Sequence, residues 1–342
     1  MMIREAIGKL ADRTSLTEKE AEEVMNEVMD GAATPAQIAA YLMGLRLKGE
    51  SVEEIAGSVR AMRGRAVRIA VGDPLVVDTC GTGGDGRHTF NVSTTSAFVV
   101  AGAGLTVAKH GNRSVSSKSG SADVLAALGV KIDLPTGRVA DCINDIGIGF
   151  LFAPLYHGAM KHCAVPRQEL GIRTMLNVLG PLTNPAGAGI QVIGVYEPRL
   201  TELLGKVLMH LGSQHSFVVH GMDGLDEITL TDRTLISEAR GGVLSTYVLN
   251  PSEFGLTKVS PKELAGGSPE DNALMTKEIL QGRKGPKRDM VCLNAAPALV
   301  AGHKAKTLAD GFALAAKTID SGAAAEKLAR LIAYTNADHR SP

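Results

Sequence analysis

The stretch Asp78–Thr94, DTCGTGGDGRHTFNVST, decides the interpretation of this 342-residue chain. It begins at the end of the apolar run Leu75–Asp78, which predicts a short strand, and it runs into a helical pattern over Phe90–Val100. Glycines between a strand and a helix let the backbone approach a ligand closely and turn its N–H groups inward. The stretch therefore predicts an anion-binding loop at the carboxyl end of a strand in an α/β protein.

A long window without acids surrounds this loop. From Arg87 to Ala122 there are 36 residues and no carboxylate, although the whole chain has 36 acidic and 36 basic residues. The window holds four fixed cations and eleven Ser or Thr side chains. Backbone amides, hydroxyls and cations together suit a ligand that carries several phosphates.

Composition limits the class of protein. The length indicates two domains, or one large α/β domain with an extension, and 44% hydrophobic residues supply a sizeable core. A net charge of zero gives no global attraction to nucleic acid or to a membrane. Four scattered cysteines without a CxxC pair indicate reduced thiols. With no signal peptide and no run of 18 apolar residues, we expect a cytoplasmic protein.

Residues 1 to about 65 are predicted to be helical. Thr34–Gln37, TPAQ, combines an N-cap Thr, a Pro at the first helical position and a Gln at the third. A second capping box opens at Ser51. An earlier helix begins after either Ser15 or Thr17, and the sequence does not choose between them. The region is therefore predicted to be a small helical bundle without chemistry of its own.

Downstream of this region, predicted strands alternate with predicted helices. Such alternation indicates a largely parallel sheet with helices on both faces. The further predicted strands cover 105–108, 191–196, 216–220 and 243–249, and the further helices cover 121–128, 200–211, 269–281 and parts of the Ala-rich C-terminal third.

The segment Gly81–Gly86 also matches GxGxxG, the dinucleotide-binding pattern. That reading expects an acid about 20 residues later, where this chain has none. No GxxxxGK[ST] motif is present, so the chain is not a P-loop NTPase. A purely structural tight turn would leave the basic, hydroxyl-rich window unexplained.

Two further segments point to the same ligand. Lys109–Arg113, KHGNR, follows a predicted strand and should lie at the carboxyl end of the sheet. Asp226 and Glu227, in GMDGLDE, follow the predicted strand 216–220, and adjacent carboxylates near phosphates suit Mg²⁺. A solvated basic turn and a solvated acidic loop are the alternatives. The Gly- and Pro-punctuated stretch 152–185 predicts a chain that crosses between two lobes.

In order along the chain, DxxGTGGDG, TFNVST, KHGNRSVSSKSGSADVLAALG, LFAPLYHGAMKH, GIRTMLNVLGPLTNP and GMDGLDE closely resemble the anthranilate phosphoribosyltransferase family of tryptophan biosynthesis. The resemblance extends from the N-terminal helices to the C-terminus. It implies a small α-helical domain, 1–70, which dimerises and is hinged to a larger α/β domain, 74–342, with a mostly parallel sheet flanked by helices. A crossover near 168–188 joins the two. Departures are small, at His88 and at the order Val165-Pro166-Arg167.

The resemblance also implies the reaction and its site. Phosphoribose would pass from phosphoribosyl pyrophosphate (PRPP) to the amine of anthranilate with Mg²⁺, two ions per monomer. Asp226, Glu227 and Ser93 would bind the metal, and Gly81, Asn112 and Arg167 would bind anthranilate, with Arg167 on its carboxylate. Lys109, His110 and Asn112 would serve catalysis. The residues implied for PRPP are Gly81, Gly84, Asp85, Thr89, Asn91, Val92, Ser93, Thr94, Lys109, His110, Gly111, Asn112, Arg113, Ser114, Val115, Ser116, Ser117 and Ser121.

Two other functions remain open at this point. A pyrimidine nucleoside phosphorylase with this fold would need a site for free phosphate, and GGD with KHGNR fits the transferase better. A non-enzymatic nucleic-acid-binding relative would need a net basic face and could lose both GTGGD and the acidic pair. Both are intact here and the net charge is zero.

Overall fold

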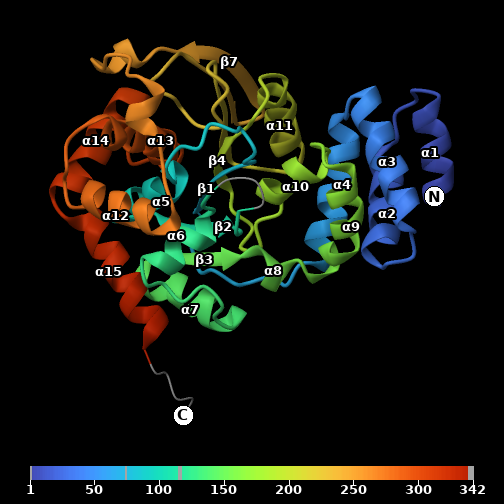
Figure 1. Ribbon diagram of the computed structural model, residues 1–342, viewed down its shortest axis with the longest axis horizontal. Coiled ribbons are helices and arrows are strands. Elements are labelled where there is room, and N and C mark those ends of the chain that lie inside the picture. Colours follow the sequence, from blue (N-terminus) through green and yellow to red (C-terminus); the bar gives the residue numbers. More distant parts are fainter. Residues whose placement is uncertain (1, 74, 115–117, 338–342) are drawn as a thin grey trace.

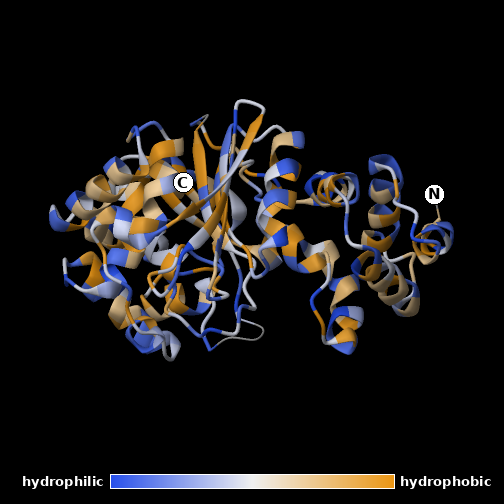
Figure 2. Ribbon diagram, turned by 90° about the horizontal axis from the view of Figure 1, so that it is seen from above, coloured by the Kyte–Doolittle hydropathy of each residue, from blue (hydrophilic) through white to orange (hydrophobic). Residues whose placement is uncertain are grey.

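The computed structural model describes residues 2–73, 75–114 and 118–337. In Figure 1 the N-terminal helices stand together at the right, beside a larger body in which helices surround a sheet. Figure 2 shows mainly hydrophobic strands inside the larger body and the N-terminal helices set to one side. Within the described residues, no helix is long and apolar enough to cross a membrane. The predicted combination of a helical domain and an α/β domain is confirmed.

The N-terminal helices begin at side-chain caps that the sequence encodes locally. Thr34 and Ser51 each accept a hydrogen bond from the third residue of the helix that follows, as predicted. Of the two alternatives for the earlier helix, Thr17 is the cap, with Glu20 completing its capping box. The four helices are α1 Ile3–Ala11, α2 Glu18–Met29, α3 Pro35–Lys48 and α4 Val52–Arg65.

The sheet has seven strands in the order β3-β2-β1-β4-β5-β6-β7. The first five run parallel, and β6 and β7 complete the edge as antiparallel strands. The strand order reverses at β1 and β4, and the carboxyl ends of such a pair form the usual ligand crevice of α/β proteins. The strands are β1 Val76–Gly81, β2 Thr106–Gly111, β3 Ile148–Phe152, β4 Ile190–Gly194, β5 His215–Gly221, β6 Thr234–Arg240 and β7 Val243–Leu249.

Helices pack on both faces of the sheet. One face is buried in a large apolar cluster with α5 and the C-terminal helices, which lie at the left of Figure 1. The opposite face packs against α11 and α10 in a second cluster, which continues into the N-terminal helices. The bounds are α5 Val92–Gly102, α6 Ser121–Ala127, α7 Thr136–Ile146, α11 Arg199–His210, α12 Pro269–Leu280, α13 Pro286–Ala301, α14 Leu308–Asp320 and α15 Ala323–Asn336, with 3₁₀ turns η2 Pro251–Phe254 and η3 Pro261–Leu264.

The segment between β3 and β4 returns to the N-terminal helices. It contains short helices, of which α9 contacts α3 and α10 contacts α4. In the same region the hydroxyl of Ser58 in α4 donates to the sulfur of Met175 at 3.6 Å. This part of the chain therefore touches both bodies. Its elements are α8 Ala153–Tyr156, η1 Gly158–Cys163, α9 Ala164–Leu170 and α10 Leu176–Leu182.

Several elements differ from the sequence-based prediction. Strands β3 and β6 and helix α7 were not predicted, and α5 begins two residues later than expected. Strands β1 and β2 each extend three residues further, to Gly81 and Gly111. Glycine is a poor strand residue by propensity, but these two glycines lie in the ladder beside their parallel neighbours.

Candidate functional site

The glycine-rich loop leaves β1 at the point where the sheet reverses its order. The amide of Thr82 donates to the carbonyl of Gly194 in β4 at 2.9 Å, which ties the loop to the neighbouring strand. A Cβ at Gly81 would lie 2.5 Å from Oδ2 of Asp226, and one at Gly194 would overlap the Asp226 backbone oxygen. Glycine is required at Gly194, where a Cβ would overlap backbone, and at Gly81 it leaves room for the Asp226 carboxylate in its hydrogen-bonded position.

The two carboxylates of this acidic loop are bound by the backbone of the predicted anion site. Asp226 accepts a hydrogen bond from the Gly83 amide at 2.7 Å, and Glu227 accepts one from the Ser93 amide at 3.1 Å. The loop after β5 therefore meets the glycine loop and the start of α5 at one place, although its residues are 143 and 134 positions from their partners Gly83 and Ser93.

Burial and mutual repulsion make these carboxylates hard to ionise together. Burial first, and then the neighbouring charge of Asp226, raise the pKa of Glu227 to about 8. Burial also raises the pKa of Asp226, and the Asp85 carboxylate adds to that shift. A divalent cation bound to carboxylate oxygens would relieve the repulsion among Asp226, Glu227 and Asp85. Among the described residues, however, no three acidic, His or Cys side chains are grouped closely enough to hold a metal ion by themselves. As candidate ligands of a divalent cation, Asp226 and Glu227 would therefore need further oxygen ligands from outside the pair, such as those of a bound phosphate.

Lys109 lies beneath the loop rather than on an open surface. Its side chain is buried, and Nζ donates to the carbonyl of Thr79 in β1 at 2.6 Å. Burial lowers the pKa of Lys109, whereas the charge of Asp78 opposes that effect. The ammonium also lowers the pKa of Glu227. The structure therefore places Lys109 as a buried cation that balances the acids around the end of β1.

His110 is also buried and stands next to a second histidine. Its ring centroid lies 5.1 Å from that of His157, which comes from the end of α8. Burial, followed by the charge of His157, lowers the pKa of His110 to about 3. His110 is therefore neutral at pH 7, and it would act there as a hydrogen-bonding group rather than as a cation.

The rest of the KHGNR segment turns toward α6. Asn112 is exposed, and its backbone oxygen accepts from the amide of Ala122 at 3.2 Å and the hydroxyl of Ser121 at 3.3 Å. Arg113 is also exposed and forms an ion pair with Asp123 at 2.9 Å. Asp123 also accepts from the Ser114 amide at 3.0 Å. Val115, Ser116 and Ser117, also expected to bind PRPP, lie outside the described residues.

The start of α5 supplies backbone groups and small polar side chains. Val92 is buried in the core, so only its backbone could face a ligand. Asn91 donates to the carbonyl of Ser119 at 3.2 Å and accepts from Asn272 of α12 at 2.9 Å. Thr89 pairs with Ala265 as an isolated β-bridge. The C-terminal third of the chain thus braces this part of the site.

The predicted PRPP residues fall into three groups at the same edge of the sheet, because β1 and β2 are parallel neighbours. Gly81 ends β1, and Gly84 and Asp85 follow it; Thr89, Asn91, Val92, Ser93 and Thr94 surround the start of α5; and Lys109, His110, Gly111, Asn112, Arg113 and Ser114 complete and follow β2, with Ser121 opening α6.

Arg167 lies apart from this group, on α9. It is partly buried, and α9 packs against α3 of the N-terminal helices. In the described part of the chain, Arg167 forms no hydrogen bond or ion pair with Gly81 or Asn112. Among the described residues, no hydrogen bond or ion pair joins any two of the three residues expected to bind anthranilate.

Sequence reasoning missed a residue that holds the acidic loop in place. Asn294 of α13 is buried, and its amide accepts from the Ile228 N–H and donates to the Ile228 carbonyl, each at 2.8 Å. It also donates to the carbonyl of Met290 at 2.9 Å. Ile228 directly follows Glu227, so Asn294 fixes the backbone next to the acidic pair. An Asn in an apolar helix, NAAPALVA, was the only available sequence signal.

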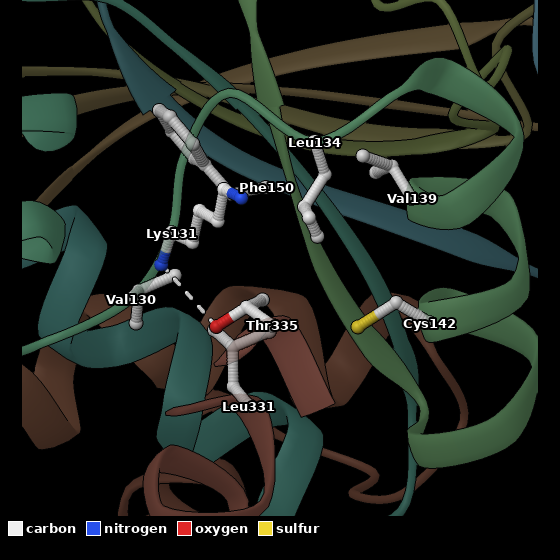
Figure 3. A pocket seen from close by; sticks show the side chains of 8 residues that line it. All are labelled: Val130, Lys131, Leu134, Val139, Cys142, Phe150, Leu331 and Thr335. Carbon is white, nitrogen blue, oxygen red and sulfur yellow. Dashed lines mark hydrogen bonds between the residues drawn. The ribbon is translucent and has the colours of Figure 1, made fainter. Parts of the chain in front are cut away.

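A small pocket elsewhere is mainly apolar. Figure 3 shows it between α7, β3 and α15, where the Lys131 amide donates to the Thr335 hydroxyl at 3.2 Å. The lining side chains are Val130, Lys131, Leu134, Val139, Cys142, Phe150, Leu331 and Thr335. None belongs to the predicted site, so this pocket is not the candidate active site.

Sequence profiles of known families define the class of protein. The helical bundle domain of the glycosyl transferase family matches residues 4–66, and the α/β domain of the same family matches residues 73–325. Fold and site thus define a two-domain glycosyl transferase.

Individual relatives narrow this class. The anthranilate phosphoribosyltransferase of Moorella thermoacetica is 55% identical over 97% of this chain and 98% of its own length. That of Desulfosudis oleivorans is 54% identical over 98% of this chain and 100% of its own length. The chain belongs to the anthranilate phosphoribosyltransferase family, which confirms the resemblance found in the sequence.

Solved structures agree with this membership. The crystal structure of anthranilate phosphoribosyltransferase from Thermus thermophilus superposes with a TM-score of 0.92 at 43% identity, covering 97% of this chain and 99% of that one. The Saccharomyces cerevisiae enzyme, in complex with PRPP and Mg, gives a TM-score of 0.87 at 29% identity over 97% of each chain.

Proposed function

We propose that this chain transfers the phosphoribosyl group of PRPP to the amine of anthranilate, giving N-(5-phosphoribosyl)anthranilate and pyrophosphate in tryptophan biosynthesis. The observation that carries the proposal is the meeting of the glycine loop, the start of α5 and the acidic pair at one edge of the sheet. Family membership over nearly the whole chain supports it.

In the proposed reaction a bond forms between the anthranilate nitrogen and C1′ of the ribose, and the bond from C1′ to the pyrophosphate oxygen breaks. The aromatic amine is neutral at pH 7, so it needs no base before it attacks, and its surplus proton leaves after the new bond forms. The residues of this chain therefore act mainly by positioning the substrates and by stabilising the departing anion.

We assign the PRPP phosphates to the loop amides, the start of α5 and the residues from Lys109 to Ser121. Backbone N–H groups and hydroxyls at a helix start are suited to phosphate oxygens. Lys109 supplies a fixed charge from below, and neutral His110 supplies a hydrogen-bonding ring. Asn112, exposed at the end of β2, would meet both substrates.

Asp226 and Glu227, with Ser93, would hold two Mg²⁺ ions per monomer. Bound there, Mg²⁺ would neutralise charge on the leaving pyrophosphate. The raised pKa values of the acidic pair support this assignment: burial first, and then repulsion between neighbouring acids, disfavours the ionised forms, and a bound cation would offset both.

Arg167 would bind the anthranilate carboxylate, since a guanidinium can hold a carboxylate through two hydrogen bonds. Because α9 packs on α3, approach of the helical domain, 1–70, to the α/β domain, 74–342, would bring Arg167 to the PRPP site. Such closure, with the crossover near 168–188 as its joint, would also exclude water from PRPP.

The N-terminal helices would form a homodimer interface. The resemblance to the family implies this role, and the amphipathic, capped helices show no cluster of polar groups fit for chemistry in their sequence. The four cysteines are buried and unpaired, which fits a reducing compartment such as the cytoplasm.

The test of the function is an assay with anthranilate, PRPP and Mg²⁺, in which the product is identified by mass spectrometry. Parallel reactions with pyrimidine nucleosides and inorganic phosphate test for a phosphorylase. Formation of phosphoribosyl anthranilate, without release of free base from nucleosides, is the expected result. Phosphorolysis alone would refute the proposal.

A further inference from the structure

The side chain of Arg173 lies against the glycine loop. It lies in the segment between α9 and α10, three residues after the end of α9. A Cβ placed on Gly84 would lie 3.4 Å from Nε of Arg173 and 3.7 Å from its Nη2. The guanidinium therefore covers the loop residue that directly precedes Asp85.

The ring of Tyr196 supports this guanidinium. The central carbon of the guanidinium, Cζ, lies 4.3 Å from the Tyr196 ring centroid, a distance typical of a cation–π contact. Tyr196 follows β4, so the pair stands at the carboxyl end of the strand next to β1. Stacking fixes the plane of the guanidinium but leaves its N–H groups at the edge available to an acceptor.

No carboxylate in the described ranges forms an ion pair with Arg173. The neighbouring acid Glu197 pairs instead with Arg199 at 2.9 Å and with Arg46 at 3.5 Å. A partly buried guanidinium beside an anion-binding loop thus keeps its hydrogen-bonding capacity for something other than protein acids.

The base of Arg173 is anchored on the helical domain. Thr174 and Met175, the next two residues, are buried, and Met175 packs with α4 in the second apolar cluster. The Thr174 amide donates to Asn177 at 3.0 Å, which fixes the local turn. The backbone of Arg173 therefore belongs to a segment packed on the helical domain, whereas its guanidinium lies against a loop of the α/β domain.

We infer that Arg173 is a binding residue for the pyrophosphate group of PRPP and for the pyrophosphate product. The planar fork of a guanidinium suits phosphate oxygens, and the glycine loop offers amides to the same ligand. The inference rests on the proposed function and adds a residue to the leaving-group end of that site. The competing possibility is that Arg173 binds the anthranilate carboxylate.

The test compares Arg173→Gln with the parent enzyme and with Arg199→Gln. The first change keeps the stem and a planar head over Tyr196 but removes the charge. The control removes an arginine at the same edge of the sheet that is paired with Glu197. For each protein, KM is measured for both substrates, together with product inhibition by pyrophosphate at fixed Mg²⁺, and folding is checked by thermal melting.

Arg173→Gln should raise the KM for PRPP and the inhibition constant of pyrophosphate by about tenfold or more, the loss typical of one charge-assisted contact. The KM for anthranilate should stay within about twofold, as should all constants of the control. Arg173→Lys should be intermediate, because lysine keeps the charge but not the fork.

Unchanged PRPP and pyrophosphate constants would overturn the inference, and so would a rise confined to anthranilate. If Arg173→Gln does not fold, Arg173→Met, which keeps the apolar stem, carries the same expectations. A parent enzyme that makes no phosphoribosyl anthranilate would instead refute the proposed function. If the parent enzyme is active and Arg173→Gln has the same kinetic and inhibition constants, only the role of Arg173 is refuted.

Discussion

Glu227→Gln should stabilise the metal-free protein at alkaline pH while it weakens magnesium binding. The folded-state pKa of Glu227 is about 8, above its ordinary value of 4.5. A carboxyl group whose pKa is higher in the folded than in the unfolded state contributes its full stability at a pH below its unfolded-state pKa. That contribution is lost as the pH rises through its folded-state pKa. At pH 8 the raised pKa lowers the free energy of unfolding by on the order of 4 kcal/mol relative to low pH. Burial is the main cause of the raised pKa, but Glu227 is only half-buried by its accessible surface, so solvent screening reduces this figure and we expect about 2 kcal/mol.

The assay is chemical unfolding at pH 8 and at pH 4, in EDTA and with Mg²⁺. In EDTA at pH 8 the variant should be more stable than the parent, and at pH 4 the difference should vanish. Magnesium should raise the stability of the parent at pH 8 and leave the variant almost unchanged, since one ligand is lost. The control Glu202→Gln removes an exposed carboxylate and should change the unfolding free energy by less than about 0.5 kcal/mol. A variant that is less stable than the parent in EDTA at pH 8 would refute this reasoning.

Three other predictions concern Lys109, Arg167 and the N-terminal helices. Lys109→Met should lower the unfolding free energy by about 3 kcal/mol, because it leaves the acids around Thr79 without their buried cation. It should also lower kcat. Wild-type stability of the variant in urea unfolding would refute this structural role of Lys109. Arg167→Ala should raise the KM for anthranilate at least about tenfold and leave the KM for PRPP nearly unchanged, and the reverse pattern in steady-state kinetics would reassign α9. Sedimentation should give a mass near twice 35.7 kDa, and an active enzyme that stays monomeric would contradict a dimer through the N-terminal helices.

The parts of the fold that were predicted correctly are those that local chemistry encodes. The capping boxes at Thr34 and Ser51 could be predicted because each N-cap residue and its partner are only three residues apart in the sequence. The strand Val243–Leu249 was predicted with the observed bounds. Its neighbour β6 was missed because TLISEAR mixes polar and apolar residues and lacks the continuous apolar run typical of a buried strand, although β6 lies between β5 and β7.

The geometry of the site depended on contacts that no local pattern encodes. An acid-free window and an acidic pair suggested phosphate and metal chemistry, but a lysine in a polar motif gives no sign that it is buried on the carbonyl of Thr79. Asn294 reaches Ile228 across 66 residues, and Arg173 meets Gly84 across the crevice. Such pairings arise only when the sheet order brings the strand ends together.

The most direct test of the central claim is the fluorescence of anthranilate after mixing with PRPP, Mg²⁺ and protein. We predict a decay that requires all three components and gives equal amounts of phosphoribosyl anthranilate and pyrophosphate. The decay should be lost in the Asp226→Ala, Glu227→Ala double variant, which removes the proposed metal ligands. Stable fluorescence with the folded parent protein, or an equal decay in EDTA, would contradict the account.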